Sequence, residues 1–304
     1  MSLKVTILGC HSATPRTSAH PTSQLLEIQN RFFLIDCGEG TQVQLRKYKI
    51  KFSKIKHIFI SHLHGDHIFG LIGLISTFRL LNRNAKLHVY GPKGIKEFIV
   101  TQLRLSHSFA GYPIEFHELI SKESELIYED EKVTVHTIPL SHRIYTNGFL
   151  FREKIGERKL NISAIKKHSE IEICDYQNLK NGNDYQLENG EIIPNENLTS
   201  NPLKPLSYAF CSDTSYKEDI VPIIKNVDLL YHETTFLNDK KDLAKTTKHS
   251  TALQAAKIAK LANVDKLIIG HYSSRYKDIE AFKTEAQEVF HNTELAIEGK
   301  TFEL

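Results

Sequence analysis

The sequence predicts an α/β fold with an arm inserted in its second half. Short apolar runs alternate with helical patterns along most of the chain, as expected where strands alternate with helices. With 304 residues, 40% of them hydrophobic, the chain can bury about 75% of the surface that it exposes when unfolded, so a packed core needs no disulfide bonds. The alternation weakens between about residues 151 and 205, and this is where we expect the arm.

The strand candidates are short apolar runs bounded by polar residues. They are Val5 to Leu8, Phe32 to Ile35, Ile58 to Ile60, Leu87 to Tyr90, Val133 to Leu140, Tyr208 to Cys211, Leu229 to Tyr231 and Leu267 to Ile269.

Two segments have helical patterns. Ile68 to Leu81 is the first of them and follows the third strand candidate along the chain. The last helix is better marked, because Thr251 and Gln254 have the spacing of a capping box and alanines repeat at helical spacing behind them.

The segment from Phe151 to Pro205 is polar, rich in Asn, Glu and Lys, and bounded by Pro202 and Pro205. We expect a single domain over residues 1–304, with this segment as its inserted arm. No repeat of fixed period is visible, which argues against a solenoid.

Composition favours a soluble, cytoplasmic protein. The four cysteines lack the close pairing of a zinc ribbon, and neither a signal peptide nor a long apolar run opens the chain. The net charge of +3 is too small for a general nucleic-acid coat, although a local basic stripe could hold a polyanion. The sixteen histidines are informative, because a neutral imidazole is a metal ligand.

The strongest local signal is the motif His62-x-His64-x-Asp66-His67, directly after the strand candidate Ile58 to Ile60. On an extended backbone His62 and His64 point the same way, and a turn at Gly65 would let Asp66 and His67 face a second point. Such a density of imidazole and carboxylate favours metal binding over a solvated loop. The spacing suits two adjacent metal ions better than one.

Three further ligand candidates stand where other strand candidates end. His142 follows Val133 to Leu140, Asp213 follows Tyr208 to Cys211, and His271 follows Leu267 to Ile269. Ligands distant in sequence can meet beyond the carboxyl ends of strands in an α/β sheet. We therefore add these three residues to the metal site.

Together these residues resemble the metallo-β-lactamase superfamily, whose fold is an αββα sandwich with the metals in a cleft between the sheets. Five blocks are more specifically similar to the ribonuclease Z family of tRNA 3′-processing endoribonucleases. The blocks are Phe32 to Gln42, His62 to His67, His232 to Thr235, His249 to Thr251 and Ser273 to Tyr276.

The resemblance implies two zinc ions per chain. One would be held by His62, His64 and His142, and the other by Asp66, His67 and His271, with Asp213 between them. Asp66 would also handle the proton of the attacking water. The expected reaction removes the 3′ trailer from precursor tRNA, leaving a 3′-hydroxyl on the tRNA and a 5′-phosphate on the trailer, and the resemblance also implies a homodimer.

Other residues are expected to serve the leaving group and the RNA. His249 is the candidate proton donor, with Glu233 holding its imidazole in one tautomer. Arg275 and Ser273 lie close behind His271 and are expected near the cleaved phosphate.

Arg46 and Lys47 belong to the acid-free segment Thr41 to Lys56. This segment is either an RNA-facing stripe or a solvated helix face. The inserted arm is a further candidate tRNA-binding exosite.

Three alternatives stay open at this point. The nearest is another dinuclear zinc phosphodiesterase or an arylsulfatase-like hydrolase of the same superfamily. A β-lactamase or glyoxalase is disfavoured, because zinc β-lactamases usually offer a cysteine ligand where this chain has Asp213. A non-catalytic RNA- or zinc-binding scaffold would need no proton donor such as His249.

Overall fold

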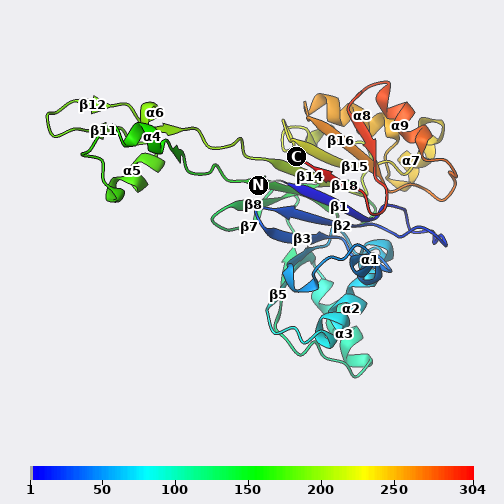
Figure 1. The fold of residues 1–304 in the computed structure, drawn as a ribbon. Coiled ribbons are helices and arrows are strands. Elements are labelled where there is room, and N and C mark those ends of the chain that lie inside the picture. Colours follow the sequence, from blue (N-terminus) through cyan, green and yellow to red (C-terminus); the bar gives the residue numbers. More distant parts are fainter. Residues whose placement is uncertain (1–2) are drawn as a thin grey trace. The chain divides into compact units, whose positions relative to one another are not determined.

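Two seven-stranded β-sheets form the centre of the structure, a computed structural model that describes residues 3–304 (Figure 1). The first sheet has the strand order β18 (Thr301–Glu303), β1 (Lys4–Gly9), β2 (Ser23–Ile28), β3 (Arg31–Ile35), β4 (Ile55–Phe59), β5 (Leu87–Pro92) and β6 (Ile114–Leu119). The second has the order β17 (Thr293–Leu295), β16 (Lys266–Gly270), β15 (Leu229–Glu233), β14 (Ser207–Cys211), β9 (Asn147–Glu153), β8 (Val133–Pro139) and β7 (Leu126–Glu129).

Aromatic side chains fill the space between the two sheets. Phe33 of β3 packs 5.4 Å from Phe151 of β9, and Phe59 of β4 packs 5.3 Å from Phe149, measured between ring centroids. All four rings are fully buried. Burying one such side chain stabilises the fold by roughly 1.5–3 kcal/mol, so this layer holds the sheets face to face.

Helices cover the outer face of each sheet (Figure 1). On the first sheet these are α1 (Thr41–Lys47), α2 (Gly65–Leu80) and α3 (Ile95–Leu105), and on the second α7 (Lys241–Thr247), α8 (Ala252–Leu261) and α9 (Glu280–Gln287). Short 3₁₀ helices span Phe52–Lys54, Glu218–Ile220 and Asn238–Lys240. The expected αββα sandwich is therefore confirmed.

The start of α8 matches the capping box that the sequence predicts at Thr251 and Gln254. The Thr251 side chain accepts a hydrogen bond from the Gln254 backbone at 3.2 Å, and the Gln254 side chain accepts one from the Thr251 backbone at 3.0 Å. The capping box is thus confirmed, and it fixes the backbone just after His249.

Some local expectations need correction. Gly65 is the first residue of α2 rather than a turn, so Asp66 and His67 lie in the first turn of a helix. Ile60 lies beyond β4. The basic segment is not one helix face, because α1 ends at Lys47 and Lys49 has a positive φ of 58°. Outside residues 154–205, the unanticipated strands are β2, β6, β7, β9, β17 and β18, of which β9 continues to Glu153.

Residues Glu153–Pro205 form a second compact unit. The unit contains β10 (Lys159–Leu160), α4 (Ile162–Ile165), a 3₁₀ turn (Ile173–Asp175), α5 (Tyr176–Lys180), β11 (Tyr185–Gln186), β12 (Ile192–Ile193), α6 (Asn195–Leu198) and β13 (Thr199–Ser200). It has a small apolar core of its own, made by Ile165, Ile171, Leu179, Ile193 and Leu198. The segment is thus more ordered than its weak sequence periodicity indicated, because elements of two to five residues are too short for a helical or strand period to repeat.

No helix within residues 3–304 is both long enough and apolar enough to cross a bilayer.

The loop after β3 is clamped against the start of α2. The Gly70 backbone N–H donates to the Cys37 carbonyl at 2.9 Å, and the Cys37 N–H donates to the His67 carbonyl at 2.8 Å. A Cβ added at Gly70 would lie 2.0 Å from the Gly38 carbonyl oxygen, which belongs to the backbone and cannot rotate away. The close approach of α2 to the loop after β3 therefore requires glycine at position 70.

We expect Gly70→Ala to lower the free energy of unfolding by about 2 kcal/mol or more, because α2 must move away from the loop. Gly73→Ala is the matched control, since its Cβ would meet only the flexible Gln42 side chain at 2.9 Å. Thermal unfolding of both variants checks this. Equal stability of the two variants would contradict the clamp.

Candidate metal centre and active site

Seven ligand-type side chains from four segments of the chain meet at one end of the sandwich. His62 follows β4, His64 caps α2, and Asp66 and His67 occupy the first turn of that helix. The remaining three stand after strands of the second sheet, namely His142 after β8, Asp213 after β14 and His271 after β16. They form two four-residue groups that share Asp213.

The first group contains three ring nitrogens and one carboxylate oxygen. His64 Nδ1 lies 3.0 Å from His62 Nε2 and 3.2 Å from His142 Nε2. Asp213 Oδ2 lies 3.6 Å from His62 Nε2 and 3.8 Å from His142 Nε2.

The second group uses the other oxygen of Asp213. Asp213 Oδ1 lies 3.4 Å from His67 Nε2 and 3.2 Å from His271 Nε2. Asp66 Oδ2 lies 3.3 Å from each of the same two nitrogens. The Asp213 carboxylate therefore faces both groups, one oxygen to each.

These spacings fit metal coordination. Four ligand atoms about 2.0–2.1 Å from a zinc ion stand about 3.3 Å apart along the edges of a tetrahedron, which matches the second group closely. In addition, His67 Nε2 is buried and makes no hydrogen bond within the described residues 3–304. The donor set of imidazole and carboxylate is one that zinc accepts.

The nitrogens that face away from the centre are held by hydrogen bonds. His67 Nδ1 donates to Asp36 Oδ2 at 2.7 Å, and His142 Nδ1 donates to the Lys248 carbonyl at 2.8 Å. These bonds place the proton on Nδ1 and leave Nε2 free to act as a ligand. Asp36 also accepts two hydrogen bonds from Ser61, which hold its carboxylate in place.

Glu233 organises the opposite wall of the site. Its fully buried carboxylate accepts hydrogen bonds from His249 Nδ1 at 2.8 Å and from the Thr235 hydroxyl at 2.7 Å, besides three backbone N–H groups. Because the Thr235 hydroxyl donates to Glu233, its oxygen can accept from His271 Nδ1 at 2.8 Å. One carboxylate thus orients His249 directly and His271 through Thr235.

Burial and charge act in opposite directions on the pKa values at this wall. Burial alone lowers the pKa of His249, but the Glu233 carboxylate outweighs it and raises that pKa to about 9. Burial raises the pKa of Glu233, while His249 holds it below its usual value. The contact that the sequence analysis expected between these two residues is present.

The ligands open into a cavity of about 600 Å³. Asp66, Asp213 and His249 line it, and Ser273 and Arg275 lie at the same cavity. Arg143, an exposed residue directly after His142, also lines it and was missed by the sequence analysis. Asp36 and Thr235 were missed as well, although both stand inside blocks that the resemblance marked.

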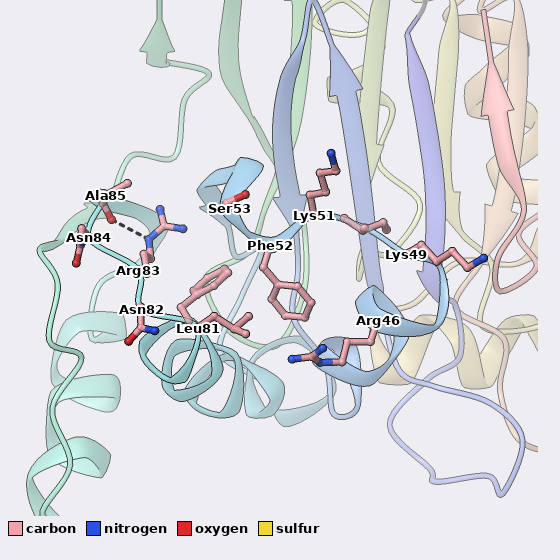
Figure 2. A pocket seen from close by; sticks show the side chains of 12 residues that line it. Arg46, Lys49, Lys51, Phe52, Ser53, Leu81, Asn82, Arg83, Asn84 and Ala85 are labelled. Atoms are coloured by element: carbon pink, nitrogen blue, oxygen red, sulfur yellow. Dashed lines mark hydrogen bonds between the residues drawn. The ribbon is translucent and has the colours of Figure 1, made fainter.

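Arg46 and Lys47 do not line this cavity. Arg46 lines a separate cavity of about 570 Å³ at the carboxyl-terminal ends of α1 and α2, where its guanidinium lies 5.4 Å from the centre of the Phe52 ring (Figure 2). Lys49 and Lys51 extend away from the middle of that cavity (Figure 2). Lys47 lies over the ring of Tyr48 at 5.3 Å.

The arrangement defines a class of protein, the metallo-β-lactamase fold. The metallo-β-lactamase fold protein YhfI of Bacillus subtilis superposes with a TM-score of 0.70 at 18% identity and covers 100% of this chain and 99% of its own. A family model described as Anti-Pycsar protein Apyc1 matches residues 3–156, which include the motif from His62 to His67 but stop before Asp213.

Relatives that match the full length are more specific. The ribonuclease Z of Porphyromonas gingivalis is 47% identical over 303 residues, covering 100% of this chain and 99% of the relative. The short form of human tRNase Z superposes with a TM-score of 0.73 at 28% identity and covers 98% of both chains. The chain belongs to the ribonuclease Z family.

Asp36→Asn should weaken zinc binding about 10–100-fold, because the amide removes the charge that holds the His67 proton on Nδ1. The fold should persist, since the amide has the same shape. Competition with a zinc-selective chelator measures the affinity. Asp130→Asn, a carboxylate paired with Arg31 at 2.7 Å outside the cluster, is the control. An unchanged affinity in Asp36→Asn would contradict this role.

Proposed function

We propose that the chain is a zinc-dependent endoribonuclease that removes the 3′ trailer from precursor tRNA. The products would be a tRNA with a 3′-hydroxyl and a trailer with a 5′-phosphate. The observation that carries the proposal is a single cavity lined by residues from both four-ligand groups and by His249, in a chain that belongs to the ribonuclease Z family.

Seven residues would hold two Zn²⁺ ions. His62, His64 and His142 would bind one ion and Asp66, His67 and His271 the other, with Asp213 shared by both. When bound, such a pair lowers the pKa of water and stabilises charge on a phosphate.

The protein's own groups would position and move protons. Asp66 lines the cavity and its carboxylate would accept the proton of the attacking water. His249, fixed through Nδ1 by Glu233, would present Nε2 to the ribose 3′ oxygen and donate its proton as the P–O bond breaks.

Basic and polar side chains would hold the RNA on either side of the cleaved bond. Arg275, Ser273 and the newly found Arg143 lie at the cavity and suit the scissile and flanking phosphates. Arg46 and Lys47 would contact phosphates farther along the RNA, since they stand outside the cavity.

The unit Glu153–Pro205 would be the tRNA-binding exosite. Lys159, Lys166 and Lys167 are exposed and available to phosphates. Arg158 stabilises the unit internally, because its guanidinium donates hydrogen bonds to Thr199 at 2.7 Å and to Asn201. A cytoplasmic homodimer stays the expected form of the protein, and sedimentation of the purified chain would test the dimer.

The direct test is incubation with a 3′-extended precursor tRNA, a chromogenic phosphodiester and a β-lactam, with mapping of the RNA ends. We expect one cut at the trailer junction, with the ends stated above. Chelation should abolish cleavage and added zinc should restore it. Hydrolysis of the small diester without any cut in the RNA would favour the rival phosphodiesterase, and turnover of the β-lactam alone would refute both.

His249→Ala should lower kcat for precursor tRNA about 10²–10⁴-fold, because the ribose oxygen leaves poorly without a proton. Hydrolysis of a bis(p-nitrophenyl) phosphate should fall much less, since p-nitrophenolate leaves unprotonated. Thr247→Ala, at the same cavity, is the matched control and should keep both activities. Equal losses on both substrates would mean that His249 supports the site rather than the leaving group.

Removing the arm should reduce kcat/KM for precursor tRNA far more than for the small diester, because only the large substrate uses remote contacts. Arg152 of β9 pairs with Ser207 of β14 in antiparallel register, so an Asn-Gly turn can replace residues 154–205 and close a hairpin. A variant with Lys159, Lys166 and Lys167 changed to Ala keeps the arm and should show a smaller loss of the same kind. Equal losses on the two substrates, at unchanged zinc content, would argue against an exosite.

A further inference from the structure

A second group of potential metal ligands lies away from the active site, on strands β5 and β6. His88 stands on β5, and Glu115 and His117 stand on β6, the edge strand of the first sheet. His88 and Glu115 are direct partners in the parallel register, and His117 is the partner of Tyr90. All three side chains therefore project from the same face of the sheet.

The three side chains converge on one point. His88 Nδ1 lies 3.1 Å from His117 Nε2. Glu115 Oε2 lies 3.8 Å from His88 Nδ1, and Glu115 Oε1 lies 3.9 Å from His117 Nε2. Ligands around one zinc ion stand about 3.3 Å apart, so the nitrogens are already at that spacing and the carboxylate must approach by about 0.5 Å.

The carboxylate has the freedom to make that movement. The Glu115 side chain is 47% exposed, compared with 25% for His88 and 31% for His117. Glu115 Oε2 accepts a hydrogen bond from Lys86 Nζ at 2.8 Å, while the interaction with His117 uses Oε1. Lys86 is thus a competitor of a metal ion for this carboxylate.

The surrounding rings hold both imidazoles in place. His57 stacks on His88 with a centroid distance of 4.9 Å, and Tyr90 stacks on His117 at 4.2 Å. Burial lowers the pKa of His88 and of His117, which favours the neutral ring, the form in which imidazole binds metals.

We propose that His88, Glu115 and His117 form an additional site for a divalent transition metal such as Zn²⁺, separate from the active-site pair. Two imidazoles and one carboxylate suit zinc and its neighbours rather than Mg²⁺ or Ca²⁺, which prefer oxygen ligands. Three protein ligands leave a coordination position open to solvent. The bound ion would tie the edge strand β6 to β5 through side chains, besides the backbone ladder that already joins them.

The site shares no residue with the active-site ligands. Those ligands follow the ends of strands or begin α2, whereas His88, Glu115 and His117 lie within β5 and β6. Changes here can therefore be tested with the active site intact.

The test measures the zinc content of the full-length wild type and of its variants. Each protein is loaded with zinc and then dialysed against a series of buffers of increasing free Zn²⁺ concentration. Wild type should hold one equivalent more than His88→Ala or His117→Ala in elemental analysis. His291→Ala, an exposed histidine outside any such group, should match wild type. Hydrolysis of the chromogenic diester should be unchanged in all variants, which shows that the active site is folded and loaded.

A gain-of-affinity variant gives an independent check. Lys86→Met removes the competing ammonium, so the additional equivalent should bind at severalfold lower free Zn²⁺. The proposal is overturned if His88→Ala and His117→Ala hold as much zinc as wild type across the range. It is also overturned if Lys86→Met leaves the affinity unchanged or weakens it.

Discussion

Both ligand groups depend on the carboxylate of Asp213, which interacts with each of them. One of its oxygens faces His62 and His142, and the other faces His67 and His271. The residue is 2% exposed, and a buried carboxylate is stable only beside positive charge. Burial raises the pKa of Asp213, but His271 and His67 hold that pKa well below its usual range.

Bound metal ions would balance the negative charge of the site while its histidines stay neutral. The histidines can ligate a metal only when neutral, yet Asp36, Asp66 and Asp213 all place carboxylates in the same buried region. A pair of bound cations would offset that negative charge and would use the free ring nitrogens at the same time. The fold contributes outer hydrogen bonds to Nδ1 of His67, His142 and His271, which leave Nε2 of these rings facing inward.

Backbone conformation at the strand ends sets the directions of these side chains. Asp36, Asp213 and His271 have positive φ angles of 54°, 51° and 64°. Such a conformation costs roughly 1–2 kcal/mol for a residue with a side chain, although Asp and His tolerate it better than most. It lets the chain turn sharply where a strand ends, so that the side chain points into the site. The stability of the two packed sheets offsets this local strain.

Features of the fold and of the site could be predicted where the evidence for them is local in the sequence. The alternation of strands with helices and the His62 to His67 motif were predictable, because strand periodicity and ligand spacing are local properties of the chain. The αββα arrangement of the two sheets came from the family resemblance. The prediction of His142, Asp213 and His271 as ligands depended on the assumption that ligands gather beyond the ends of strands. The full tRNA-processing assignment depended on the family resemblance. Asp36, Thr235 and Arg143 were missed, since their roles depend on hydrogen bonds and proximity between segments far apart in sequence. The placement of Arg46 away from the cavity depends on where α1 ends, which a run of cations does not reveal.

Anomalous diffraction at the zinc edge, from crystals of the zinc-loaded protein, tests the central claim most directly. The account predicts two peaks about 3.5–4 Å apart, one among His62, His64 and His142 and one among Asp66, His67 and His271, with Asp213 between them. A single peak at full zinc saturation, or two peaks that leave Asp213 outside both coordination shells, would contradict it.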